Sequence, residues 1–261
     1  MPPVAAAAGT VSRGGGHCVS PRTIRAEQAA PAPDSTNDLK ESDMQSTRRR
    51  FVLAAALAPT VPAALAQPKA PVPQRDFREV RPAQPVDTGS KIEVLEFFQY
   101  SCPHCASFDP DLEGWRRKMP ADVEYRRLPV AFNAATANHS KIYYALQQLN
   151  KVEELHRKVF AAYHVQRKRL LDPNEIADFM AANGVDRKAW LDAFNSFAVA
   201  TQTNRAAQVW AAYKLEGTPA VAVDGKWLTA PSMVGSRPGT LPVIDHLVAL
   251  ARKERGAGAK K

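Results

Sequence analysis

Two cysteines, Cys102 and Cys105, are separated by two residues. They follow an apolar segment rich in β-branched and aromatic side chains, residues 91–100. This segment is predicted to be a central strand. Pro103, directly after the first cysteine, is typical of the first turn of a helix. Because one helical turn brings positions i and i+3 onto one face, the two sulfurs can lie within bonding distance. The pair therefore predicts a strand-to-helix junction in an α/β fold.

The position of the pair also predicts its chemistry. The first cysteine would lie near a helix N-terminus, where unpaired N–H groups and the helix dipole stabilise an anion. The thiolate is the nucleophile in disulfide exchange, so Cys102 is expected to be the exposed, attacking sulfur and Cys105 the buried, resolving one. His104 lies between them and could add a hydrogen bond or positive charge to the Cys102 thiolate. We expect an apparent pKa below about 6 for Cys102.

Other uses of a cysteine pair fit less well. A structural zinc site needs four ligands, but no second cysteine pair exists and His139 has no partner at ligand spacing. A c-type haem requires histidine directly after the second cysteine, where this chain has Ala106. An inert structural disulfide remains an alternative, although so short a loop at an exposed helix start favours a labile bridge. The prediction is a redox-active disulfide with no metal and no other cofactor.

The rest of the chain alternates between strand and helix patterns. Residues 103–119 are predicted to form the helix after the cysteines, and residues 123–128 a second strand. Strand character returns at 219–223 and 226–228, joined by the turn Asp224-Gly225. Further helices are expected at 138–149, 151–163, 173–183, 186–194, 198–213 and 241–251.

This order predicts an α/β domain, residues 91–135 and 214–255, with an all-helical domain, residues 136–213, inserted into it. Four tryptophans at helix or strand spacing are expected in the core: Trp115, Trp190, Trp210 and Trp227. Four histidines with no constellation around them are expected on surfaces or helix faces: His139, His156, His164 and His246.

The N-terminal part of the chain reads as an export signal rather than as part of the fold. Residues 1–43 lack apolar periodicity and are expected to be disordered or untranslated. Residues 44–66 carry three arginines, a short apolar stretch and small residues before a cleavage site after Ala66, as in a signal peptide of the general or twin-arginine type. Residues 67–90 read as an extended, proline-rich leader, in which residues 77–80 could add one short edge strand.

Removal of the signal would leave a basic chain with a single cysteine pair. The third cysteine, Cys18, and seven basic and five acidic residues precede the cleavage site, so the net charge would change from +9 to +7. The positive residues are scattered, and the run Arg167-Lys168-Arg169 is expected to be a solvated surface. The sequence contains no basic stripe flanked by aromatic residues, and so it does not indicate a nucleic-acid partner.

The active-site segment, residues 97–105, resembles that of the DsbA family, the periplasmic oxidases that introduce disulfides. Pro103-His104 is the dipeptide typical of that family. The helical insertion is also similar, as are Gly217-Thr218-Pro219, where the family has a cis-proline opposite the active site, and residues 228–233. The resemblance covers roughly residues 77–250 and implies a thioredoxin-like fold. It also implies that Glu96 is a buried acid that relays protons and tunes the potential, with Asp109 in the place of a second acid.

The same resemblance implies an activity. A thioredoxin-like protein of this kind would donate the Cys102–Cys105 disulfide to unfolded, exported proteins in the periplasm. Thr218 and Pro219 would line the substrate groove, and a quinone-linked membrane partner of the DsbB type would restore the disulfide. A monomer is expected, since residues 67–90 are too few for a dimerisation domain. Two alternatives stay open: a disulfide isomerase or reductase of the same fold, and a non-catalytic periplasmic peptide-binding protein.

Overall fold

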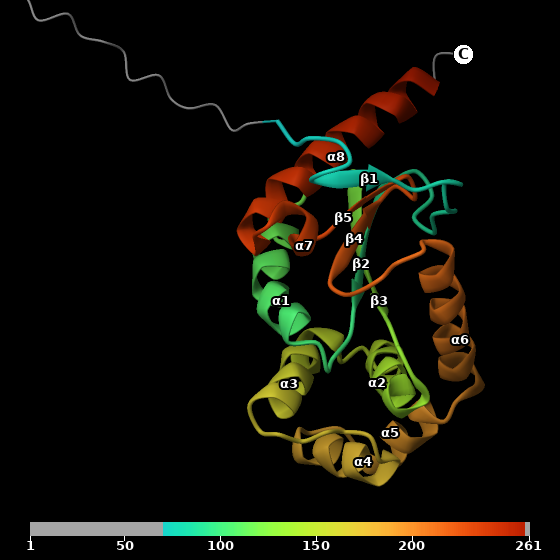
Figure 1. Ribbon diagram of the computed structural model, residues 1–261. Coiled ribbons are helices and arrows are strands. Elements are labelled where there is room, and N and C mark those ends of the chain that lie inside the picture. The colour runs from blue at the N-terminus through green and yellow to red at the C-terminus, as the bar shows by residue number, and fades with distance from the viewer. Residues whose placement is uncertain (1–69, 259–261) are drawn as a thin grey trace, which may run out of the picture. The chain divides into compact units, whose positions relative to one another are not determined.

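The computed structural model describes residues 70–258 (Figure 1). The predicted N-terminal extension (1–43), the predicted signal peptide (44–66) and Cys18 lie outside these residues. No helix among the described residues is long and apolar enough to cross a membrane.

A five-stranded mixed sheet forms the centre of the described fold, in the order β1-β5-β4-β2-β3. Strand β2 (Ile92–Phe98) pairs in parallel with β3 (Val123–Pro129) and antiparallel with β4 (Ala220–Val223). Strands β5 (Trp227–Thr229) and β1 (Phe77–Glu79) complete the antiparallel side. All seven residues of β2 are buried, as expected for a central strand flanked on both sides.

The turn between β4 and β5 ties the N-terminal segment to the sheet. Asp224 and Gly225 both have positive φ, 54° and 68°, as the predicted hairpin turn requires. The Gln84 N–H donates to the Gly225 carbonyl at 2.8 Å. A Cβ on Gly225 would lie 2.0 Å from the Gln84 carbonyl oxygen, so the close approach needs glycine. The described part of residues 67–90 thus lies against the sheet and supplies buried side chains such as Val80.

The predicted helices are present, with ends that differ by a few residues. Helix α1 (Pro103–Arg116) follows the cysteines and ends three residues earlier than expected. The long helical stretch contains a short 3-10 helix (Ala134–Thr136), α2 (Ala137–Gln148), α3 (Val152–His164), α4 (Pro173–Ala182), α5 (Arg187–Phe194) and α6 (Phe197–Ala212).

The C-terminal part departs most from the prediction. A short helix, α7 (Pro231–Val234), was not expected, and α8 (Arg237–Gly258) begins four residues before the predicted helix. The side-chain oxygen of Ser236 accepts from the Gly239 N–H at 3.1 Å, at the point where the helix begins.

Two apolar clusters cover the two faces of the sheet. Helices α1 and α8 pack on one face, where Phe108 and Ile244 meet Val94. The other cluster is continuous from Phe97 on β2 to Trp190 on α5, so the helices of residues 136–213 share one core with the sheet. Trp115, Trp190 and Trp227 are buried as predicted, whereas Trp210 is half-buried.

Candidate active site

The cysteine pair lies where β2 leads into α1. Cys102 is the N-cap residue of α1 with extended backbone angles (φ −83°, ψ 116°), and Pro103 occupies the first turn. The backbone N–H of Cys105 donates to Cys102 Sγ at 3.4 Å. Cys102 is partly exposed and Cys105 is fully buried, which matches the exposure predicted for the two sulfurs. The more reactive position therefore faces solvent at a helix N-terminus.

The two thiols have opposite electrostatic environments. Hydrogen bonds from the Cys105 thiol, and next from the Cys105 backbone N–H, outweigh desolvation and lower the pKa of Cys102 to about 5. Burial raises the pKa of Cys105 well above its usual range. At neutral pH the pair therefore holds one thiolate, on Cys102, and one protonated thiol, on Cys105.

The loop before β4 lies directly opposite Cys102. The Thr218–Pro219 peptide bond is cis, as expected from the sequence. Cys102 Sγ lies 3.3 Å from the Thr218 carbonyl oxygen, although 116 residues separate the two in sequence. The Thr218 hydroxyl is buried and has no hydrogen-bond partner among residues 70–258.

A groove of about 1,100 Å³ extends from this loop. His104, exposed on the first turn of α1, lies at its edge. Its apolar lining includes Leu215, Pro219, Leu228, Ala230 and Met233. An apolar groove beside an accessible sulfur suits an extended peptide that contains a cysteine.

Glu96 is buried, with 1% of its surface exposed, in the middle of β2. The Tyr125 hydroxyl donates to its carboxylate, and Arg127 Nε lies 3.3 Å from the same oxygen. Burial outweighs the opposing effect of Arg127 and raises the pKa of Glu96 to about 7. No hydrogen bond links Glu96 to either cysteine within the described part of the chain.

Arg127 connects two buried carboxylates, Glu96 and Asp109, and the half-buried Glu113. It is an ion-pair partner of Glu96 and of Glu113, and its Nη2 lies 3.4 Å from Asp109 Oδ1. Arg127 was not among the residues predicted for the site, because a charged residue in a strand usually indicates an exposed face. Two of its partners, Asp109 and Glu113, come from α1.

His139 and His156, which were expected on surfaces or helix faces, lie on α2 and α3 with their side chains buried. They are 1% and 3% exposed, while His164 is half-buried. His156 Nε2 lies 3.3 Å from Asp109 Oδ1, and its Nδ1 is 2.8 Å from the Tyr100 hydroxyl. The four-residue spacing of His156, Phe160 and His164 could have placed both histidines on one helix face.

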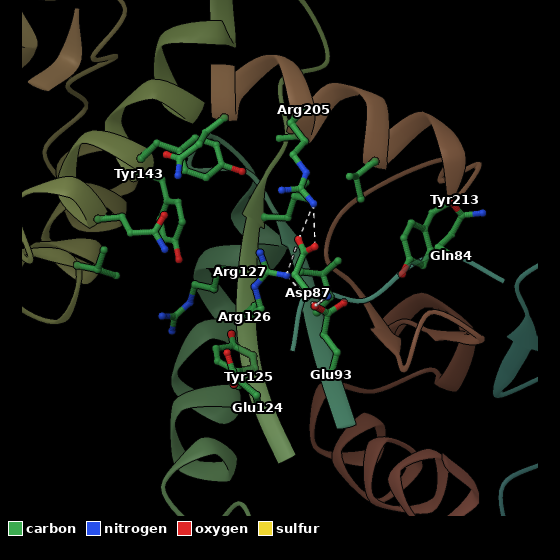
Figure 2. A pocket seen from close by; sticks show the side chains of 18 of the residues that line it. Gln84, Asp87, Glu93, Glu124, Tyr125, Arg126, Arg127, Tyr143, Arg205 and Tyr213 are labelled. Carbon is green, nitrogen blue, oxygen red and sulfur yellow. Dashed lines mark hydrogen bonds and ion pairs between the residues drawn. The ribbon is translucent and has the colours of Figure 1, made fainter. Parts of the chain in front are cut away.

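A second cavity of about 770 Å³ lies between β3, α2 and α6. Figure 2 shows Arg126 and Arg205 directed toward Asp87, which both contact at distances of 2.7–3.1 Å. Neither cysteine lines this cavity. Among residues 70–258, no group of three or more His, Cys, Asp or Glu side chains is arranged to hold a metal ion.

Comparison with known proteins decides the family. The family model described as DSBA-like thioredoxin domain matches residues 120–238. The thiol:disulfide interchange protein DsbA of Bordetella parapertussis is 43% identical over 215 residues, which cover 80% of this chain and 100% of that protein. The chain belongs to the DsbA family.

Other DsbA proteins agree with this assignment. DsbA of Burkholderia cepacia is 42% identical over 186 residues, covering 71% of this chain and 88% of that protein. The crystal structure of Pseudomonas aeruginosa DsbA superposes with a TM-score of 0.68 at 37% identity, covering 73% of this chain and 97% of the other. The chain is thus a thiol:disulfide interchange protein with a thioredoxin-like fold and a helical insertion, a disulfide oxidoreductase of oxidative protein folding.

Proposed function

We propose that Cys102 and Cys105 carry the exchange, with Cys102 as the sulfur that meets the substrate. In the oxidised enzyme, a substrate thiolate attacks Cys102 Sγ and the Cys102–Cys105 bond breaks. Cys105 leaves as a thiolate and takes up one proton. A second substrate thiolate then attacks the substrate sulfur of the mixed disulfide, and Cys102 leaves as a thiolate. The substrate loses two electrons and gains a disulfide, and the enzyme gains the two electrons.

The observation that carries this proposal is the position of Cys102 Sγ at the N-cap of α1. A leaving group that is stable as an anion departs easily, and the hydrogen bond from the Cys105 N–H supports that anion. Pro103 fits the first turn because a backbone N–H at this position would have no acceptor within the helix. The exposed His104 adds a further donor or positive charge for the thiolate.

The apolar groove is the proposed binding site for the substrate chain. Pro219 has no N–H and lines the groove, so the adjoining Thr218 backbone can meet an extended peptide. Glu96 is proposed as the group that supplies and removes the proton of Cys105, directly or through water. A carboxyl group with a pKa of about 7 exchanges protons readily at neutral pH.

We also propose the periplasm as the site of action, reached through the signal in residues 44–66. Its partners would be reduced, unfolded exported proteins and a DsbB-like membrane quinone reductase that restores the disulfide. We propose a monomer that does not bind nucleic acid.

Measuring the reduction potential against glutathione tests the direction of the reaction. A potential far above that of thioredoxin, about −270 mV, is expected of an oxidase, and a value near it would favour the reductase alternative. A Cys102→Ser variant should lose oxidation of a reduced peptide completely. If the variant still oxidises the peptide at the wild-type rate, another site carries the reaction. If the wild type binds the peptide but does not oxidise it, the protein is a peptide-binding protein.

A further inference from the structure

The loop between β2 and α1 is held by helix α3. Tyr100, two residues before Cys102, is 1% exposed. Its hydroxyl lies 2.8 Å from His156 Nδ1, and its carbonyl oxygen lies 2.8 Å from His164 Nε2. Both histidines belong to α3, so this one helix contacts the side chain and the backbone of Tyr100.

His156 extends this link to the helix that carries the cysteines. Its Nε2 lies 3.3 Å from Asp109, which follows Cys105 by one helical turn on the buried side of α1. Ion-pair partners hold the pKa of Asp109 below its usual value in spite of burial, so its carboxylate is an acceptor. His156 Nε2 therefore carries the proton, and Nδ1 accepts from the Tyr100 hydroxyl.

Aromatic contacts fix the position of the Tyr100 ring. The Tyr100 ring centroid lies 5.1 Å from that of Phe98 and 5.0 Å from that of Phe160, both in edge-on arrangements. The ring therefore stays in place when its hydroxyl is removed. This separates the effect of the hydrogen bond from that of packing.

The geometry at Cys102 depends on how this loop meets α1. The Cys102 N–H donates to the Gln99 carbonyl at 3.0 Å, and Cys102 Sγ accepts from the Cys105 N–H. Tyr100 lies within the turn that the contact between Gln99 and Cys102 closes. The chain of contacts from Tyr100 through His156 to Asp109 joins the loop and the helix behind the sulfur pair.

We propose that Tyr100 and His156 are positioning residues for Cys102: by tying the loop to α1, they hold Cys102 Sγ where the helix N-terminus stabilises its thiolate. This inference rests on the proposed role of Cys102. Neither residue touches the substrate or the sulfurs. Their effect reaches the reaction through the stability of the reduced form.

The test is a Tyr100→Phe variant, which removes one hydroxyl and keeps the ring. Loss of one buried hydrogen bond, at about 0.7 kcal/mol, would shift the equilibrium with glutathione about threefold toward the disulfide, roughly 14 mV. The pKa of Cys102, followed by thiolate absorbance, should rise by about half a pH unit. In a His156→Phe background, Tyr100→Phe should cause no further shift, because the acceptor is already gone.

Tyr143→Phe is the matched control. Its ring packs against Phe98 and His156 in the same cluster, but its hydroxyl has no partner among residues 70–258, so neither quantity should change. His139→Phe controls for loss of a buried histidine, since His139 bonds to the Arg169 carbonyl and not to the cysteine loop.

Several results would overturn the inference. One is an equal loss of thermal stability in both redox forms with no change in the equilibrium, which would mean that the contact only supports folding. Another is an equal shift in Tyr143→Phe. If the wild type itself has an ordinary thiol pKa at Cys102, the proposed function fails first. If the wild-type pKa is low but Tyr100→Phe leaves it unchanged, the inference alone fails.

Discussion

At the scale of single residues, the thiols of Cys102 and Cys105 lose their protons at different pH values. The pH dependence of the reduction potential should show this difference. Below pH of about 5, reduction takes up two electrons and two protons, so the potential should fall by about 59 mV per pH unit. Above that pH Cys102 stays a thiolate, only Cys105 takes a proton, and the slope should halve to about 30 mV.

The measurement is the equilibrium with a redox buffer between pH 4 and 8, with the glutathione potential corrected at each pH. The break in slope should lie near the pKa of Cys102. A single slope of about 59 mV through pH 7 would mean that both sulfurs keep their protons, which contradicts a stabilised thiolate.

Glu96 allows a second prediction, in the oxidised protein, where the two thiols do not titrate. Its pKa is raised from 4.5 to about 7, so the folded state binds more protons than the unfolded state in that range. Stability should therefore fall as the pH rises from about 4.5 to 7. A pKa difference of one between the folded and unfolded states corresponds to about 1.4 kcal/mol, so at most about 3.5 kcal/mol is lost.

Glu96→Gln should remove this part of the pH dependence, because the amide does not titrate. Urea unfolding at pH 5 and pH 8 measures it as the difference between the two free energies. If wild type and variant change equally with pH, Glu96 does not have a raised pKa. Tyr125→Phe serves as a comparison, because it removes a donor to Glu96 without removing the carboxyl group.

At the scale of elements, the buried turn between β4 and β5 should be sensitive to substitution. Gly225→Ala should destabilise the protein by more than about 1 kcal/mol, because alanine disfavours positive φ. Its Cβ would also meet the Gln84 carbonyl at 2.0 Å and displace that segment from the sheet.

Gly114→Ala is the opposite case and the control. Gly114 lies on the exposed side of α1 with open space around it, so alanine should stabilise the helix by up to about 1 kcal/mol. Thermal unfolding of both variants measures the effects. Changes of the same sign would mean that the contact with Gln84 does not fix the turn.

Local patterns were enough to predict most of the elements. The apolar run of residues 92–98 and the Asp224-Gly225 turn each signal one kind of structure, and both are present. Helix α7 and the first turn of α8 were missed; in the structure, α8 begins where the Gly239 N–H donates to the Ser236 side chain. Element boundaries are set by such individual contacts.

The candidate site was predictable where its residues are adjacent in sequence, and elsewhere only through family resemblance. Cys102, Pro103, His104 and Cys105 form one continuous segment. The contact of Cys102 with Thr218 spans 116 residues, and that of Asp109 with His156 joins α1 to α3. Nothing in a single sequence pairs a buried histidine with a carboxylate on another helix, and so His156 was expected on a surface or a helix face without a partner.

At the scale of the whole molecule, the continuous core predicts that the sheet and the helical insertion unfold together. Phe98 on β2 is fully buried and packs against Tyr143, His156 and Phe160 of the insertion. Phe98→Ala should therefore cost about 3–5 kcal/mol and lower the stability of both parts equally. Hydrogen exchange of β2 and α5 amides would show the same loss, whereas a loss confined to one part would indicate two independent units.

The stability of the whole folded protein should also depend on its redox state. In the reduced form the pKa of Cys102 is lowered from 9.0 to about 5, so between these values the unfolded chain binds more protons than the folded one. The stability of the reduced form should rise with pH across that range by at most about 1.4 kcal/mol per pH unit, and by less because solvent reaches Cys102. This stability is lost as the pH falls through about 5.

In the oxidised form Cys102 has no thiol to titrate. The free energy of unfolding of the reduced form should therefore increase relative to that of the oxidised form between pH 5 and 9. Urea unfolding of both forms at several pH values measures it, and parallel profiles would contradict it. Because folding and oxidation form a thermodynamic cycle, the stability difference equals the free energy by which folding favours the dithiol over the disulfide. A protein that is more stable when reduced transfers its disulfide to unfolded chains with a favourable change in free energy.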